Sequence, residues 1–155
     1  VLRETRSNSQ GPSLNGQLQV FLGHPGGPFW KNRDAGAWSI PKGLVLADEE
    51  PLAAACREFA EETGHRPTGD FLPLGTIRQK SGKMVHAWAC QGDLDPASAV
   101  SNTFPLEWPP RSGRQIEVPE IDRGHWFSLG EAREKINPAQ AELIDRLVAL
   151  LATAD

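Results

Sequence analysis

The sequence predicts a mixed α/β fold in a single domain that spans residues 1–155. Short segments with the apolar alternation of β-strands lie on both sides of residues 51–63, whose apolar residues recur with helical spacing. A second helical pattern ends the chain, and no internal repeat interrupts this order. A length of 155 residues suits one domain with a real buried core.

The first segments are predicted to be strands and loops. Residues 1–2 are interpreted as the end of a strand, and residues 5–16 as a loop because they are polar and rich in turn formers. Residues 18–22 (LQVFL) alternate apolar side chains on one face, which predicts a strand. Glycines and prolines punctuate residues 24–36, which indicates a long loop.

Aromatic and basic side chains come next. Phe29 and Trp30 are either packed against the protein or part of a substrate wall, and we expect packing. Lys42 is either a phosphate contact or an ordinary exposed lysine, and the sequence favours neither. Residues 44–50 are predicted to form a loop that brings Glu49 back beside the following helix.

Residues 51–63 have the start, the periodicity and the end of a helix. Pro51 suits the first helical position, and Gly64 suits the left-handed residue that ends a helix. Apolar residues at i, i+3, i+4 and i+7 predict one buried face, made of Leu52, Ala55, Cys56 and Phe59. Cys56 is therefore expected to be a small core residue.

Residues 71–90 predict a β-hairpin with a tight turn at 79–83. Three basic side chains lie near the turn: Arg78, Lys80 and Lys83. They either steer a polyphosphate into a site or protect an edge strand from aggregation. We expect His86 to be packed, and Trp88, on the same strand face, either fills the core or contacts a base.

The C-terminal part begins irregularly and ends in helices. Residues 91–113 are predicted to be irregular, and residues 115–118 and 125–127 to be short strands. Ser128 starts a capping box, which predicts a short helix to about residue 136. Pro138 begins a final helix, with an apolar stripe of Leu143, Ile144, Leu147, Leu150 and Leu151.

The formal net charge of −4 is concentrated in one stretch. Residues 43–65 hold six acids and one base, whereas the rest of the chain holds 14 acids and 15 bases. Glu58 and Glu62 share one line of the predicted helix with Glu61 beside them, where their repulsion and the helix dipole are both unfavourable. A divalent cation with oxygen ligands removes both penalties. A solvated acidic face is the alternative.

The spacing of polar and glycine residues in this stretch is highly specific. It runs Gly43, five residues, Glu49, seven residues, the segment Arg57-Glu58-Phe59-Ala60-Glu61-Glu62, one residue, and Gly64. This resembles the Nudix box of the Nudix hydrolase family, with His65 in place of an aliphatic residue. The resemblance points to the MutT-like nucleoside triphosphate pyrophosphohydrolases and the dinucleoside polyphosphate hydrolases, and Pro41-Lys42-Gly43 is similar to several such enzymes.

The resemblance implies a Nudix-type α/β/α sandwich with a mixed β-sheet, and a site for Mg²⁺ or Mn²⁺. The expected metal ligands are the Gly43 carbonyl, Glu58, Glu61 and Glu62. Arg57 is expected to orient Glu49 or Glu61. Family sites often add a downstream carboxylate, for which Glu107, Glu117 and Glu120 are all candidates. The general base is Glu61 or a downstream acid such as Glu120.

The implied function is metal-dependent hydrolysis of a phosphoanhydride bond in a substrate that contains a nucleoside diphosphate. The diadenosine polyphosphate subclass often has a Tyr downstream of the box, and this chain has no Tyr at all. The ADP-ribose subclass often has a Pro at the position that Lys80 occupies here. We therefore expect a nucleoside triphosphate, ordinary or oxidised, with a dinucleoside polyphosphate as the alternative. A regulatory domain that binds a nucleotide without hydrolysing it is disfavoured because the box carboxylates are intact.

Composition bounds the partners and the compartment. No run of 18 apolar residues is present, so no membrane span is expected. No secretory signal is visible, and two cysteines make no disulfide framework, so a cytoplasmic location is the default. No basic block predicts a stable nucleic-acid partner. Homo-oligomerisation stays open.

Overall fold

The computed structural model describes residues 2–4, 18–43 and 45–153; Val1 and the loop predicted at residues 5–16 lie outside them. The strands are β1 (Leu2–Glu4), β2 (Leu18–Pro25), β3 (Leu72–Arg78), β4 (Met84–Ala89), β5 (Thr103–Glu107), β6 (Gln115–Pro119) and β7 (Ile121–Ser128). The helices are α2 (Pro51–Thr63), α3 (Leu129–Lys135) and α4 (Ala141–Thr153), with short 3₁₀ turns η1 (Pro96–Ser98) and η2 (Pro138–Gln140).

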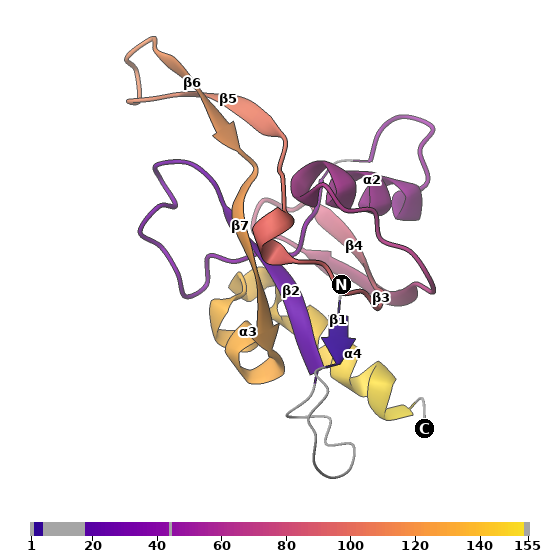
Figure 1. The fold of residues 1–155 in the computed structure, drawn as a ribbon. Coiled ribbons are helices and arrows are strands. Elements are labelled where there is room, and N and C mark those ends of the chain that lie inside the picture. The colour runs from indigo at the N-terminus through magenta and orange to yellow at the C-terminus, as the bar shows by residue number, and fades with distance from the viewer. Residues whose placement is uncertain (1, 5–17, 44, 154–155) are drawn as a thin grey trace.

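The strands lie between two groups of helices, which confirms the α/β class (Figure 1). Helix α2 packs against β4 and β7, whereas α3 packs against β2 and β7, and α4 packs against β3. The strands pair antiparallel in three sheets, of order β1-β2-β7, β3-β4 and β5-β6. A parallel pairing is present as an isolated bridge between Trp38 and Ile136.

The β2–β7 pair is the centre of the molecule, and β2 is longer than predicted. It continues through His24 to Pro25 because the fully buried His24 side chain is held there. Its Nδ1 lies 3.0 Å from Asp122 Oδ1 on β7, and its Nε2 lies 2.7 Å from the Arg33 carbonyl oxygen. The predicted loop therefore begins after Pro25, and the contact of Arg33 with His24 holds the loop against β2.

The main core lies between β2, β7 and the two C-terminal helices. Leu22, Phe127, Ala132 and Ile136 are buried there. The predicted capping box is confirmed, since Ser128 Oγ accepts a hydrogen bond from the Glu131 backbone nitrogen. The final helix starts later than predicted, at Ala141, because Pro138 opens the 3₁₀ turn η2. Of the predicted stripe, Leu143, Ile144 and Leu147 are buried, whereas Leu150 lies in the last turns and is exposed.

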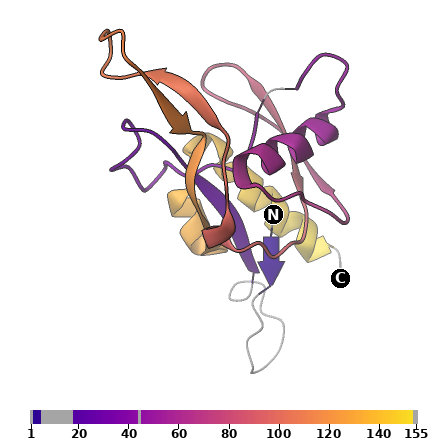
Figure 2. The same cartoon turned by 45° about the horizontal axis from the view of Figure 1, so that its top comes forward.

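The segment predicted to be irregular contains the unforeseen strand β5. It pairs with β6 to form a two-stranded ribbon that extends away from the helices (Figures 1 and 2). Pro105 lies within β5, which is compatible with an edge strand. Strand β7 is also longer than the predicted 125–127. Within the described parts of the chain, no helix has the length and hydropathy of a membrane span.

Candidate active site

Helix α2 carries the acidic residues, and its ends follow the sequence signals. Pro51 occupies the first turn, and Gly64 ends the helix at φ 75°, where its nitrogen donates to the Ala60 carbonyl over 2.8 Å. The predicted buried face is only partly correct. Phe59 is buried, but Leu52, Ala55 and Cys56 are half-buried because they line a large cavity.

Gly43 lies directly against the Glu58 side chain. A Cβ atom at position 43 would overlap the carbon and both oxygens of the Glu58 carboxylate. The absence of a side chain therefore lets the backbone at Gly43 and the carboxylate of Glu58 approach each other closely. Two oxygen-bearing groups from different segments are brought together by this contact.

Arg57 joins three of the box carboxylates. Its Nε and Nη2 donate to the two oxygens of Glu49 over 2.8 and 3.0 Å, which is a bidentate pair. Its Nη1 also donates to Glu58 over 3.0 Å and to Glu61 over 3.2 Å. Hydrogen bonding to Arg57 is the main cause that lowers the pKa of Glu49, and the bond to Glu49 is the main cause that raises the pKa of Arg57.

Glu62 is the buried carboxylate of the cluster, at 7% exposure. Desolvation is the main cause that raises its pKa to about 8, and the nearby charges of Glu120 and Glu58 raise it further. A hydrogen bond from the Lys42 backbone nitrogen, at 3.1 Å, opposes the shift. The negative charges of Glu58, Glu62 and Glu120 repel one another. This repulsion favours either a bound proton or a bound cation at Glu62.

Glu120 is the downstream acid that the fold brings to α2. It lies between β6 and β7, where its backbone nitrogen donates to the Asn102 carbonyl over 3.0 Å and its carbonyl accepts from Gly26 over 3.3 Å. Glu117 instead accepts a hydrogen bond from Thr103 along the ribbon, and Glu107 accepts one from the Gly113 nitrogen. Neither of those two acids lines a cavity beside α2.

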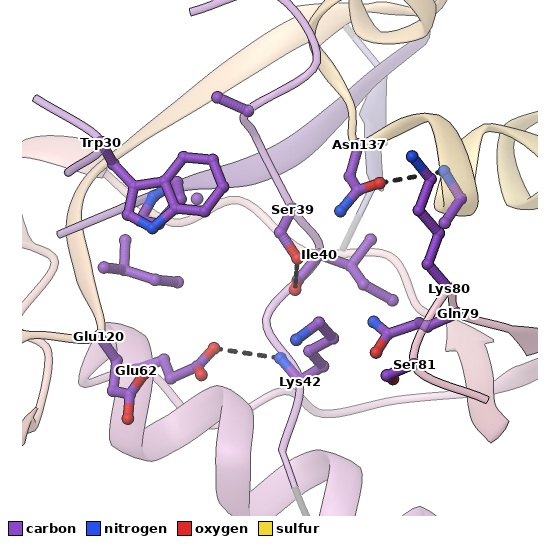
Figure 3. Close-up of a pocket in the computed structure, with 15 residues that line it drawn as sticks. Trp30, Ser39, Ile40, Lys42, Glu62, Gln79, Lys80, Ser81, Glu120 and Asn137 are labelled. Atoms are coloured by element: carbon purple, nitrogen blue, oxygen red, sulfur yellow. Dashed lines mark hydrogen bonds between the residues drawn. The ribbon is translucent and has the colours of Figure 1, made fainter. Parts of the chain in front are cut away.

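Two cavities, of about 370 and 900 Å³, meet at the acidic cluster. Their shared wall consists of Ile40, Lys42, Glu62, Gln79 and Glu120. Figure 3 shows Glu62 and Glu120 on one side of the smaller cavity, below the ring of Trp30. The larger cavity lies between α2 and the β3–β4 hairpin, and Glu58 and Glu61 also line it.

The segment at Ser39 and Ile40, which leads into this wall, is held in place by Gln140 from the C-terminal part of the chain. Gln140 is fully buried, and its Oε1 accepts a hydrogen bond from the Ile40 nitrogen over 3.0 Å. Its Nε2 donates to Ser39 Oγ over 2.9 Å. These bonds place the segment that leads to Lys42 and Gly43.

The predicted basic residues separate around the cavities. Lys42 lines both cavities, Lys80 lines the smaller one and Lys83 lines the larger one. Arg78 is exposed on β3 and lines neither, so the structure does not bring it to the cluster.

A family model for the NUDIX domain matches residues 13–147. The chain belongs to the Nudix hydrolase family. The family resemblance inferred from the box spacing is thereby confirmed. The acidic cluster described above is the part of the fold that contains the Nudix box, residues 43–65.

Relatives and solved structures agree with this assignment. An RNA pyrophosphohydrolase of Roseobacter denitrificans is 40% identical over 68 residues, which is 39% of this chain and 39% of that protein. An RNA pyrophosphohydrolase of Rhizobium meliloti is 26% identical over 153 residues, 88% of this chain and 86% of that protein. The fold is similar to a C. elegans Ap4A hydrolase in a binary complex, with a TM-score of 0.58, 21% identity, and coverage of 90% and 92%.

The donor set of this Nudix site fits a hard divalent cation. Its groups are carboxylates and a backbone carbonyl, which are the oxygen ligands that such ions prefer. The close approach of Gly43 to Glu58 and the raised pKa of Glu62 agree with a site built for positive charge. The carboxylates of Glu58 and Glu61 are turned to Arg57, and no ready cluster of three metal-binding side chains stands among residues 2–4, 18–43 and 45–153.

Two aromatic side chains contradict their expected packing. Phe29 is 54% exposed, so its predicted burial is wrong, whereas Trp30 is half-buried, packs edge-to-face on Phe29 and also lines the smaller cavity. His86 is exposed and lines the larger cavity together with Trp88. Their rings stack, with centroids 6.4 Å apart and planes 22° apart. Strand alternation placed His86 and Trp88 on one face, but it did not show that this face borders a cavity.

Some cavity residues carried no recognisable sequence signal. Ser39, Gln79 and Asn137 bring polar side chains to the smaller cavity from three separate segments (Figure 3). Asn137 precedes Pro138, and the sequence predicted only that a helix begins at this proline. Their convergence depends on long-range packing, so residue spacing alone does not reveal it.

The stability of the metal-free protein is expected to fall as pH rises between about 4.5 and about 8. The pKa of Glu62 is 4.5 in its ordinary state and about 8 in the fold, so unfolding releases a proton in that range and higher pH favours it. One such proton contributes a slope of up to about 1.4 kcal/mol per pH unit. Urea denaturation in the presence of a chelator measures this slope, and Glu62→Gln is expected to remove it. If the free energy of unfolding had the same pH dependence in wild type and in Glu62→Gln, Glu62 would not be the group whose pKa is raised by the fold.

Proposed function

We propose that this Nudix hydrolase uses a divalent cation, Mg²⁺ or Mn²⁺, to hydrolyse a phosphoanhydride bond in a substrate that contains a nucleoside diphosphate. The observation that carries the proposal is that Glu62 and Glu120 lie on the wall between the two cavities, close enough to Glu58 for their charges to raise the pKa of Glu62, and that Gly43 lies against Glu58 in the larger cavity. A polyanionic substrate is repelled by carboxylates alone, so the proposal requires a cation to reverse the local charge. When bound, the cation supplies charge neutralisation and a more acidic water molecule.

The residues of the cluster are assigned separate roles. The Gly43 carbonyl, Glu58, Glu61 and Glu62 hold the cation. Arg57 positions Glu49 through its bidentate hydrogen bond and holds Glu61 within reach of the site. Glu120, which adjoins Glu62, and Glu61 are the two candidates for the general base. These roles agree with the oxygen chemistry of the cluster.

The proposed phosphate contacts are basic side chains beside the cavities. Lys42 borders both cavities, and Lys80 and Lys83 border one each, so all three can approach a polyphosphate that crosses the shared wall. Arg78 is proposed only as a longer-range electrostatic contributor because it lines neither cavity. The predicted protection of an edge strand is compatible with this role.

A nucleoside triphosphate, ordinary or oxidised, is the simplest substrate for this site. The dinucleoside polyphosphate alternative is supported by the fold similarity to an Ap4A hydrolase. The two relatives named RNA pyrophosphohydrolase add the 5′-phosphate end of RNA as a third substrate class. A purely regulatory nucleotide-binding role is disfavoured because the box carboxylates are complete. The cytoplasmic location stays a prediction, and homo-oligomerisation stays open.

A hydrolysis screen tests the proposal. The purified chain is incubated with Mg²⁺ or Mn²⁺ and with nucleoside triphosphates, dinucleoside polyphosphates, ADP-ribose and a 5′-triphosphorylated RNA oligonucleotide, and the products are separated by chromatography. The expected products are phosphate or pyrophosphate from a triphosphate, two nucleotides from a dinucleoside polyphosphate, or AMP and ribose 5-phosphate from ADP-ribose. Their formation is expected to stop when a chelator is added. Nucleotide binding without any hydrolysis across the panel would instead support the regulatory alternative.

A further inference from the structure

The loop that follows β2, residues 26–36, brings Trp30 to the smaller cavity although much of the loop is exposed. Residues 31–35 are all exposed, so packing against the rest of the protein contributes little to their position. The first residue of the loop donates from its backbone nitrogen to the Glu120 carbonyl over 3.3 Å, and the last donates to the Glu134 carbonyl over 3.1 Å. Trp30 lies between these two ends, with its ring at the cavity (Figure 3). A contact in the middle of the loop is therefore needed to fix this ring.

His24 supplies this contact from β2. Its side chain is fully buried, with Nε2 2.7 Å from the Arg33 carbonyl oxygen and Nδ1 3.0 Å from Asp122 Oδ1 on β7. A carbonyl oxygen only accepts hydrogen bonds, and so does an ionised carboxylate, so making both bonds requires a proton on each ring nitrogen. A neutral imidazole donates to one of the two partners only. The ring is therefore a double donor that joins β7 to the loop.

Arg33 links this buried contact to the aromatic residues of the loop. Its guanidinium carbon lies 4.1 Å from the Phe29 ring centroid and 5.5 Å from the Trp30 ring centroid. The two rings pack edge-to-face, with centroids 5.1 Å apart. The Arg33 backbone nitrogen also donates to the Trp30 carbonyl over 2.9 Å. The bond from His24 to the Arg33 carbonyl therefore fixes the turn that holds Trp30 at the cavity.

We propose that His24 is a positioning residue whose bond to the Arg33 carbonyl holds Trp30 at the smaller cavity, with Asp122 orienting the His24 ring. This inference rests on the proposed function, because it concerns the part of the substrate that enters this cavity. His24 and Asp122 line neither cavity, so they act on substrate binding only through the loop. Breaking the bond leaves the carboxylates of α2 in place. The consequence is weaker substrate binding with little change in the chemical step.

Two substitutions of His24 each keep one of its two hydrogen bonds. In His24→Gln the amide nitrogen takes the place of Nε2 and donates to the Arg33 carbonyl, whereas in His24→Asn it takes the place of Nδ1 and donates to Asp122. Each variant loses one bond, so a purely structural role predicts similar effects. His24→Asn is expected to raise KM about fivefold with little change in kcat, and His24→Gln is expected to restore KM towards wild type. Steady-state hydrolysis of the best substrate from the screen measures both constants.

The Trp30→Ala background shows whether His24 acts through Trp30. His24→Asn is expected to have no further effect on KM once the ring is absent, because both changes remove the same contact. Arg33→Ala, a change at an exposed side chain, keeps the test available if a His24 variant does not fold. It removes the guanidinium from the two rings and is expected to raise KM about threefold, but not in Trp30→Ala. Additive effects with Trp30→Ala would overturn the inference.

Hydrogen exchange separates this inference from the proposed hydrolysis, because it needs no substrate. The backbone amides of residues 26–36 are expected to exchange faster in His24→Asn than in His24→Gln. If no substrate is hydrolysed, calorimetry with a non-hydrolysable nucleoside triphosphate analogue replaces KM by Kd in the same comparison. The expected exchange and Kd pattern without hydrolysis would count against the proposed function alone. Equal loop exchange in the two variants, or equal KM or Kd, would overturn the inference.

Discussion

Replacing Glu62 by Gln is expected to lower kcat by about 10³-fold or more while leaving the fold intact. The change keeps the size and the hydrogen bond from the Lys42 backbone nitrogen but removes the charge that a cation needs. Metal stabilisation of transition-state charge is worth several kcal/mol, which corresponds to this factor. Steady-state hydrolysis of the best substrate from the screen, at saturating Mg²⁺ or Mn²⁺, measures the loss.

Thermal unfolding separates a chemical effect from a folding defect in this variant. In the metal-free protein at pH 8, Glu62→Gln is expected to be at least as stable as wild type, because burial disfavours the Glu62 charge. Glu117→Gln is the matched control, since this exposed carboxylate is paired with Thr103 on the ribbon. Full activity in Glu62→Gln would remove this residue from the metal site.

Replacing Gly43 by Ala is expected to lower kcat/KM by about 10²-fold or more. The added Cβ would overlap the Glu58 carboxylate, so either the side chain or the loop must shift. Displacing a catalytic group by about 1 Å is enough for a loss of that size. The measurement is kcat/KM as a function of Mg²⁺ concentration, and a higher cation requirement is expected to accompany the loss.

A second glycine substitution controls for the chemical nature of the change. Gly130 lies in α3 with nothing close to the position of a Cβ atom, so Gly130→Ala meets no obstacle. It is expected to keep full activity and to be neutral or to stabilise the helix by about 0.5–1 kcal/mol. If Gly43→Ala behaves like Gly130→Ala, the contact with Glu58 has no role in activity.

The helix and the Nudix box were predictable because their signals are local. Pro51, Gly64 and the spacing of the glutamates each act within a few residues, and the structure has the helix between the predicted ends. The pairing of Arg57 with Glu49 also follows from the predicted loop, which needs only to turn back beside α2. The Ser128 capping box is local in the same sense.

The downstream part of the site depends on contacts that residue spacing does not contain. Glu107, Glu117 and Glu120 were equivalent candidates in the sequence, but Glu107 and Glu117 lie on the β5–β6 ribbon, whereas Glu120 lies between β6 and β7. The backbone bond of Glu120 with Asn102, and that of Gly26 with Glu120, place only this acid beside α2. The strand β5, which supplies half of the ribbon, was missed because Pro105 and the prolines after Trp108 favour irregular structure.

Residue spacing also could not show whether the apolar face of α2 and one face of β4 are buried or line a cavity. Periodicity correctly grouped Leu52, Ala55 and Cys56 on one face, but a face can border a cavity instead of a core. The same holds for His86 and Trp88 on β4. An apolar pattern therefore predicted which side chains lie together, and the packing of distant segments decided whether they are covered.

The most direct test of the central claim is Mn²⁺ binding in the absence of substrate. Electron paramagnetic resonance titration, which reports free Mn²⁺, is carried out on wild type, Glu58→Gln and the control Glu117→Gln. Removing a ligand is expected to weaken binding by about tenfold or more in Glu58→Gln, whereas Glu117→Gln matches wild type. Equal Mn²⁺ affinity in all three proteins would contradict the assignment of the acidic cluster on α2 as a cation site.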